Sequence, residues 1–166
     1  MEKRVWRFAV VTMSDKGSRG ERIDESGAFL RRFLTEAGFV EAGYRLVPDR
    51  VEAIVAAVCA MIDLGADLVV TTGGTGLAPS DVTPEAMDGV FQREVPGVAE
   101  MLRLESLKKT PMAALSRGRA GIRGESLIIN LPGSLRAARE NIAAALPILH
   151  HALEKITGDP SDCGRQ

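Results

Sequence analysis

Residues 68–87 read LVVTTGGTGLAPSDVTPEAM, and this stretch decides the fold. It opens with a short apolar, β-branched run, which predicts a strand buried on both faces. Gly73, Gly74 and Gly76 then interrupt the strand, and a backbone without Cβ atoms can adopt positive φ and bring its N–H groups close to a ligand. A helix is predicted to begin at Thr83, with the threonine as its N-cap and a proline at the first helical position. Open α/β sheets bind phosphates at such turns, at the carboxyl end of a parallel strand, although a tight turn without a ligand has the same pattern.

Two aspartates follow strand ends. Asp81 lies between the glycine turn and the predicted helix start, on a loop that a tight fold would place near a bound anion. A carboxylate beside phosphates repels them unless a cation intervenes, so Asp81 suggests a divalent metal. Asp49, taken alone, is predicted to cap the helix that begins near Val51. Because neighbouring parallel strands end at one edge of a sheet, Asp49 and Asp81 are also predicted to share that rim.

The rest of the chain alternates between strand and helix patterns. Residues 110–122 predict a short helical turn and an irregular edge strand, and Pro147 either kinks or splits the last helix. The order of the elements predicts a three-layer α/β/α sandwich with a mainly parallel sheet. Residues 1–158 are predicted to form a single domain, followed by a polar tail over 159–166. The predicted strands cover 5–13, 44–47 and 127–131 beside the central one, and the predicted helices cover 26–37, 51–64, 84–92, 98–108 and 134–156.

Other strand ends carry polar residues that a ligand or a turn explains equally. Ser14, Asp15 and Ser18 follow the first predicted strand, where serine and aspartate commonly form turns with their own backbone. Asn130 lies within an apolar run, so its amide needs a protein partner or a ligand.

Composition narrows the function classes. The chain has 166 residues and a formal net charge of −1, which gives no support for nucleic-acid or membrane binding. Its longest apolar runs fall well short of the ~20 residues of a membrane span, so a cytoplasmic location is expected. The two cysteines show neither a metal-ligand spacing nor a disulfide framework. Arginines cluster at Arg117, Arg119 and Arg123, and an anionic small molecule could account for them.

The motifs together resemble the molybdenum-cofactor biosynthesis family, over about residues 5–158. Agreement of several motifs in order is far more specific than any one of them. The resemblance rests on Ser14-Asp15, Pro48-Asp49, Thr72-Gly73-Gly74-Thr75-Gly76 with Asp81-Val82-Thr83-Pro84-Glu85-Ala86, Ser116-Arg117 through Gly124, and Asn130-Leu131-Pro132-Gly133. The Ser116–Gly124 segment resembles the branch that adenylylates molybdopterin, which includes bacterial MogA and the G domain of animal gephyrin.

This resemblance implies an enzyme, a molybdopterin adenylyltransferase that transfers AMP from Mg-ATP to the terminal phosphate of molybdopterin and releases pyrophosphate. It also implies a MogA-like fold, a homotrimer, Mg²⁺ as the cofactor and a possible handover of product to a molybdenum insertase. Asp49 and Asp81 match the family's catalytic and metal-binding aspartates. The residues implied to bind nucleotide or pterin are Ser14, Asp15, Thr72, Gly73, Gly74, Thr75, Gly76, Ser116, Asn130, Pro132 and Gly133.

The sequence departs from the family at one position and leaves other functions open. Ser80 stands where adenylylating members often carry arginine, so a phosphate contact is either weaker here or supplied by Lys16, Arg117 or Arg119. The alternatives are a MoaB-like paralogue that binds pterin or nucleotide but adenylylates poorly, a nucleotide pyrophosphohydrolase like the N-terminal domain of CinA proteins, and a non-enzymatic trimeric scaffold. The paired acids and the glycine loop favour the transferase, since the fold alone does not choose among these.

Overall fold

A computed structural model describes residues 4–158 and Pro160, and it contains a six-stranded sheet with helices on both faces. The predicted polar tail over 159–166 lies outside the described residues except for Pro160. The strands are β1 (Arg7–Met13), β2 (Val40–Val47), β3 (Leu68–Thr72), β4 (Arg93–Glu94), β5 (Ala120–Arg123) and β6 (Ser126–Leu131). The helices are α1 (Asp15–Ser18), α2 (Glu25–Glu36), α3 (Val51–Asp63), α4 (Thr83–Ala86), α5 (Pro96–Leu107) and α6 (Leu135–Ile156), with short 3₁₀ helices η1 (Met87–Gly89) and η2 (Pro111–Leu115).

The sheet has the order β2-β1-β3-β6-β5-β4 and is parallel from β2 to β6. The mainly parallel sheet predicted from the sequence is therefore confirmed. β3 lies at its centre and all five of its residues are buried, as its apolar run predicts. The predicted edge strand is wrong in its position, because β5 pairs antiparallel with both β6 and the two-residue strand β4, which forms the edge.

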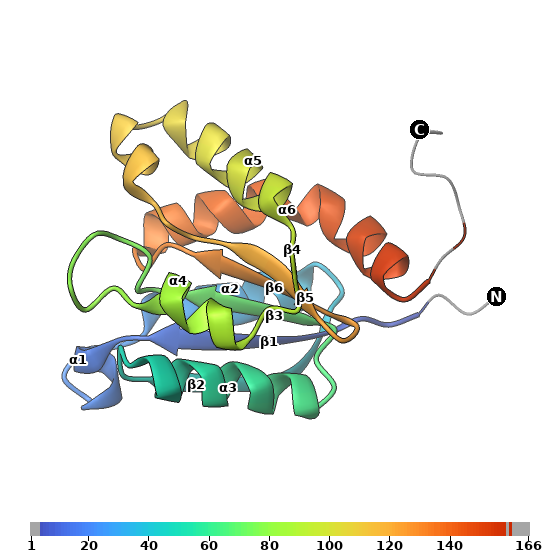
Figure 1. Ribbon diagram of the computed structural model, residues 1–166, viewed down its shortest axis with the longest axis horizontal. Helices are drawn as coiled ribbons and strands as arrows, with labels where there is room; N and C mark the ends of the chain where they lie inside the picture. The colour runs from blue at the N-terminus through green and yellow to red at the C-terminus, as the bar shows by residue number, and fades with distance from the viewer. Residues whose placement is uncertain (1–3, 159, 161–166) are drawn as a thin grey trace.

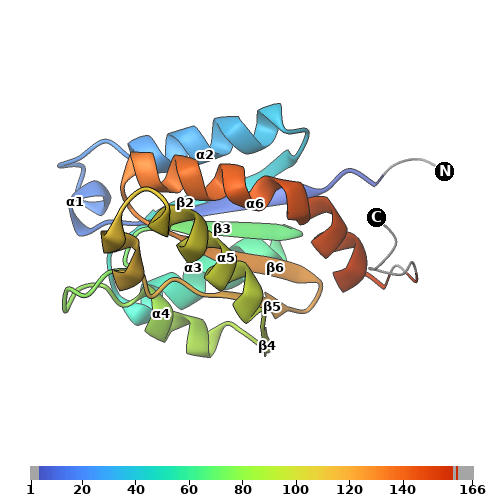
Figure 2. The same ribbon diagram turned by 90° about the horizontal axis from the view of Figure 1, so that it is seen from above.

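The two faces of the sheet carry separate apolar cores, as expected of three layers. Side chains of α2, α5 and α6, among them Leu30, Leu102 and Leu149, pack on one face. Side chains of α3 and of the α4–η1 segment, among them Ile54 and Met87, pack on the other. Figure 1 shows α5 and α6 on one side of the sheet and α3 on the opposite side, and Figure 2 shows α2 beside α6. Because helices cover both faces of the sheet, the ends of the strands are where a ligand can reach it.

The structure differs from three expectations about helix ends and continuity. Thr83 is not the N-cap of α4: it is the first residue of that helix, and its hydroxyl donates to the carbonyl of Gly73 at 2.9 Å. Asp49 does not cap α3 either, since Arg50 occupies the cap position without a side-chain hydrogen bond. Pro147 lies inside α6, which runs as one helix from Leu135 to Ile156. In the first two cases the side chain that the local pattern predicts as a helix cap instead forms a hydrogen bond with a more distant residue, Gly73 or Asp15.

The carboxyl ends of β1, β3 and β6 meet at one end of the sheet, on the left in Figure 1. The segments that follow them are α1, the glycine loop over residues 73–76, and the turn at Pro132–Ser134 that leads into α6. Segments that are far apart in the sequence are therefore brought side by side at the rim where parallel sheets place their ligand sites.

Candidate active site

The glycine loop over residues 73–76 leaves β3 in a backbone conformation that favours glycine. Gly73 has φ of 105° and Gly74 has φ of 66°. The N–H of Gly73 donates to the carbonyl of Leu131 at 3.1 Å, which ties the loop to the end of β6. Within the described part of the chain, the N–H groups of Gly74, Thr75 and Gly76 donate to no protein acceptor. The loop therefore has three backbone N–H groups that are not used in hydrogen bonds within the described protein.

Asp49 lies beside this loop and is coupled to Asp15. The N–H of Asp15 donates to Asp49 Oδ2 and the N–H of Asp49 donates to Asp15 Oδ1, both at 3.0 Å. The other carboxylate oxygen, Oδ1, lies 3.3 Å from where a Cβ on Gly74 would be. Burial raises the pKa of Asp49; the neighbouring carboxylates of Asp15 and Asp81 add to this, while the hydrogen bond from Asp15 opposes it. Burial, with the two neighbouring carboxylates, therefore makes the ionised form of Asp49 less favourable than it is in water.

Asp81 closes on the other end of the glycine loop. Its Oδ2 accepts a hydrogen bond from the N–H of Ala78 at 2.9 Å and lies 2.8 Å from where a Cβ on Gly76 would be. A side chain at either Gly74 or Gly76 would thus press on one of the two aspartates. The predicted shared rim is confirmed in this sense: Asp49 and Asp81 flank one loop, close enough to repel each other.

Two cavities of about 430 Å³ each lie on either side of this loop. The first, the α5 cavity, is bounded by α5, η2 and the first turns of α6; the second, the α2 cavity, is bounded by the end of β1 and the start of α2. Gly74, Asp81, Gly133 and Ser134 line both cavities and form their common wall. Volumes of this size fit small-molecule substrates.

The structure brings all but one of the predicted site residues to these cavities. Ser14, Asp49, Thr72 and Gly73 line the α2 cavity, Thr75, Gly76, Ser116, Asn130 and Pro132 line the α5 cavity, and Gly74, Asp81 and Gly133 line both. Asp15 lines neither, and its carboxylate instead supports the backbone of Asp49. The amide of Asn130 already has protein partners, since it donates to Thr71 Oγ1 and accepts from the N–H of Arg119. The roles of these residues in binding remain predictions.

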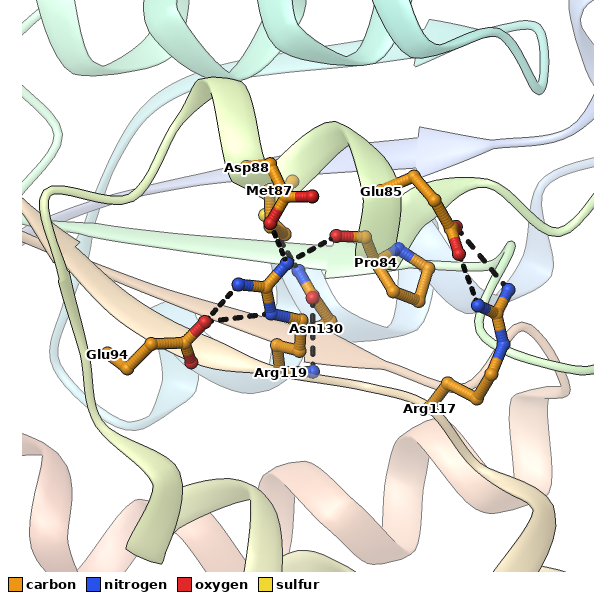
Figure 3. A network of polar contacts seen from close by, with 8 residues as sticks. All are labelled: Pro84, Glu85, Met87, Asp88, Glu94, Arg117, Arg119 and Asn130. Carbon is orange, nitrogen blue, oxygen red and sulfur yellow. Dashed lines mark hydrogen bonds and ion pairs between the residues drawn. The ribbon is translucent and has the colours of Figure 1, made fainter.

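The arginine cluster contacts the protein itself. Arg117 pairs with Glu85, and Arg119 pairs with Asp88 and Glu94 and donates to the carbonyl of Pro84, as Figure 3 shows. Arg123 donates to the carbonyl of Val90. An anionic ligand is therefore not needed to explain the cluster, and Arg117 and Arg119 do not take the place of the arginine absent at position 80.

The sequence analysis did not identify Asp24, which lines the α2 cavity at the start of α2. Its Oδ1 accepts from the N–H of Gly27 at 2.8 Å as the N-cap of α2, and its Oδ2 accepts from the hydroxyl of Tyr44 at 2.5 Å. Thr12, also in the wall of this cavity, has a buried hydroxyl without a partner among the described residues. The signal available in the sequence was the Asp24-Glu25-Ser26 pattern of a helix N-terminus.

Tyr44 is expected to titrate at about pH 12, because burial and then the hydrogen-bonded carboxylate of Asp24 raise the pKa of its phenol to about 12. The chain has one tyrosine, so the ultraviolet absorbance of tyrosinate reports this group alone. The phenol of an unfolded tyrosine has a pKa of ~10. The contribution of Tyr44 to folding stability is therefore fully present below that pH, and it is lost as pH rises through the folded-state pKa of about 12. Asp24→Asn should lower the midpoint, whereas Glu36→Gln, at the exposed far end of α2, should leave it unchanged. A wild-type midpoint at the ordinary value would contradict this assignment.

Comparison with known protein families gives a match over most of the chain. A family described as "Probable molybdopterin binding domain" matches residues 9–151. The chain belongs to this molybdopterin-binding domain family. The resemblance drawn from the motifs is thereby confirmed.

Relatives of this molybdopterin-binding domain have related names. The chain is 42% identical over 155 residues to a protein of Helicobacter pylori named molybdopterin adenylyltransferase, covering 92% of this chain and 88% of that one. It is 39% identical over 165 residues to the gephyrin of Dictyostelium discoideum, but spans only 23% of that protein's length. A solved structure of the molybdopterin biosynthesis enzyme MoaB of Thermus thermophilus superposes with a TM-score of 0.87 at 52% identity, covering 95% of this chain and 100% of that one.

Among the described residues, no helix is long and apolar enough to cross a membrane. The same residues contain no group of three or more His, Cys, Asp or Glu side chains that could hold a metal ion.

Proposed function

We propose that this chain transfers AMP from Mg-ATP to the terminal phosphate of molybdopterin and releases pyrophosphate. One observation carries the proposal: Asp49 and Asp81 flank a loop with three unused backbone N–H groups, at the wall between two cavities. A transferase that joins two small molecules needs two adjoining sites and a means of holding phosphates where they meet. The name of the Helicobacter pylori relative, to which the chain is similar over nearly its whole length, supports the same reaction.

The chain's residues would act by positioning more than by proton transfer. A phosphate oxygen of molybdopterin attacks the α-phosphorus of ATP, a new P–O bond forms, and the bond to the β-phosphate oxygen breaks as pyrophosphate leaves. The attacking phosphate is already anionic, so no strong general base is required. The N–H groups of Gly74, Thr75 and Gly76 would bind phosphate oxygens as charge spreads over them, which is the main protein contribution in such reactions.

The donor set fits Mg²⁺. This ion is usually held by one or two carboxylates together with substrate phosphates and water, so Asp49 and Asp81 suffice without a third acid. The nearby carboxylates add to the raised pKa of Asp49 after burial, and a cation held there would offset their repulsion. When bound, Mg²⁺ would neutralise phosphate charge.

The test is turnover of the purified protein with molybdopterin, ATP and Mg²⁺, following pyrophosphate and adenylylated pterin together. Formation of both products only when pterin and Mg²⁺ are present would establish the transferase. Pyrophosphate release that ignores pterin would replace the proposal with a nucleotide pyrophosphohydrolase.

One observation favours a second candidate, a MoaB-like protein that binds pterin or nucleotide without efficient transfer. The similarity to the Thermus thermophilus MoaB structure reaches 52% identity over 95% of this chain. Tight pterin binding without product in the same assay would support this candidate instead.

The remaining features of the proposal concern assembly and location. The predicted homotrimer stays a prediction; exposed apolar side chains on α5 and η2 are compatible with contact between copies, since exposed apolar patches commonly mark protein interfaces. These side chains are Leu104, Leu107, Met112 and Leu115. A cytoplasmic location and handover of the product to a molybdenum insertase remain predictions.

A further inference from the structure

Arg117 lies between η2 and β5 but makes most of its contacts with the loop that carries Asp81. Its N–H donates to the carbonyl of Thr75 at 2.8 Å, and its Nε donates to the carbonyl of Gly76 at 2.8 Å. Its Nη2 donates to the carbonyl of Asp81 at 2.6 Å. One residue thus holds both ends of the 76–81 loop, although it is 36 residues away from Asp81 in the sequence.

Few other contacts among the described residues hold this loop. Leu77 is 63% exposed, and residues 78–80 are exposed as well. Inside the loop, the N–H of Asp81 donates to the carbonyl of Ala78 and the N–H of Ala78 donates to Asp81 Oδ2, both at 2.9 Å. These two bonds fix the carboxylate relative to the loop, but they do not fix the loop relative to the rest of the site. The contacts of Arg117 supply that second connection.

The guanidinium of Arg117 is itself held in place by Glu85. Nη1 and Nη2 both donate to the Glu85 carboxylate, and Figure 3 shows the two side chains lying fork to fork. Glu85 is in α4, which directly follows the loop. The planar group therefore bonds in three directions, to Gly76, to Asp81 and to α4, which is a geometry that arginine provides and lysine does not.

We propose that Arg117 is a positioning residue that holds Asp81 against the glycine loop in the geometry required for Mg²⁺ and phosphate. The inference rests on the proposed function for its consequence, but not for the contacts that carry it. Arg117 lines neither cavity, so it acts through Asp81 and the glycine loop, not by touching substrate. Residues that orient metal ligands in this way typically matter by about 10- to 100-fold in metal affinity or activity.

The experiment compares Arg117→Met and Arg117→Lys with a matched control, Arg119→Met. Arg119 ties the same α4–η1 segment to β4 and β5 through Pro84, Asp88 and Glu94, but makes no contact with the 76–81 loop (Figure 3). Two readouts are taken on each full-length variant: amide hydrogen exchange of residues 75–82, which Arg119 does not contact, and the Mg²⁺ concentration for half-maximal adenylylation together with kcat.

For Arg117→Met we expect faster exchange across the loop and at least about a 10-fold rise in the half-maximal Mg²⁺ concentration. Arg117→Lys should lie between this variant and the wild type, and it serves as the test if Arg117→Met does not fold. Arg119→Met should lose thermal stability without changing either readout. Wild-type exchange and Mg²⁺ dependence in both Arg117 variants would overturn the inference. So would equal changes in the Arg119 variant, which would mean a general structural effect.

The outcome also separates this inference from the proposed function. If the wild type does not adenylylate molybdopterin, yet Arg117→Met and not Arg119→Met loosens the loop, the proposed function fails and the positioning role of Arg117 stands.

Discussion

Asp81→Asn is expected to fold like the wild type and to reduce kcat for adenylylation at least about 100-fold, because removing the charge of a proposed Mg²⁺ ligand should exceed the 10- to 100-fold cost typical of its supporting residues. The substitution is nearly isosteric, and an asparagine oxygen can still accept the hydrogen bond from the N–H of Ala78. It removes the negative charge and leaves the loop in place. Asp49→Asn should behave alike, since its oxygen can still accept from the N–H of Asp15.

The measurement is steady-state turnover at saturating Mg²⁺, with thermal unfolding as the check on folding. Asp88→Asn is the matched control, because Asp88 is an exposed acid of the following segment that lines neither cavity. It should keep full turnover. Full activity in a folded Asp49 or Asp81 variant would remove that residue from the proposed mechanism.

Gly73→Ala is expected to lower the free energy of unfolding by at least about 3 kcal/mol. Gly73 has φ of 105°, which a residue with a side chain rarely adopts. The added Cβ would also lie 2.4 Å from the carbonyl oxygen of Met13, which is backbone at the end of β1 and cannot move aside as a side chain can. Relief of the clash would separate β3 from β1 or break the hydrogen bond from Gly73 to Leu131.

Gly38→Ala separates the two causes in a urea titration. Gly38 also has positive φ, at 92°, but a Cβ there would meet no atom within 4 Å. It should therefore cost only the conformational strain, about 1–2 kcal/mol. Equal losses in the two variants would show that the approach to Met13 is not tight in solution.

The parts of the fold that the sequence predicts well are those with local causes. β3 is a short β-branched run with an apolar start, and the glycines after it allow the positive φ that a sharp turn needs, so the strand, the turn and the rim of acids could be expected from local sequence. The central strands and long helices follow from periodicity in the same way.

The errors have non-local causes. β4 contains two residues and exists only because β5 pairs with it, so no pattern within Arg93–Glu94 announces a strand. Thr83 resembles a helix cap in sequence, but its hydroxyl donates a hydrogen bond to the carbonyl of Gly73.

The arginines illustrate the same limit. Arg117 and Arg119 resemble a binding patch when read alone, because the acids that pair with them are 25 to 32 residues away along the chain. The contact between Arg117 and Asp81, which are 36 residues apart, is evident only once the fold is known.

The wall that the two cavities share consists largely of small residues, Gly74, Gly133 and Ser134, with Asp81. A compound that passes over this boundary and occupies both cavities would make contacts in each of them. It could dissociate only after both sets of contacts break. Joining two ligands also incurs the entropic cost of association once instead of twice. A bisubstrate compound should therefore have a much longer residence time than either half, and a product that occupies both cavities should leave more slowly than either substrate.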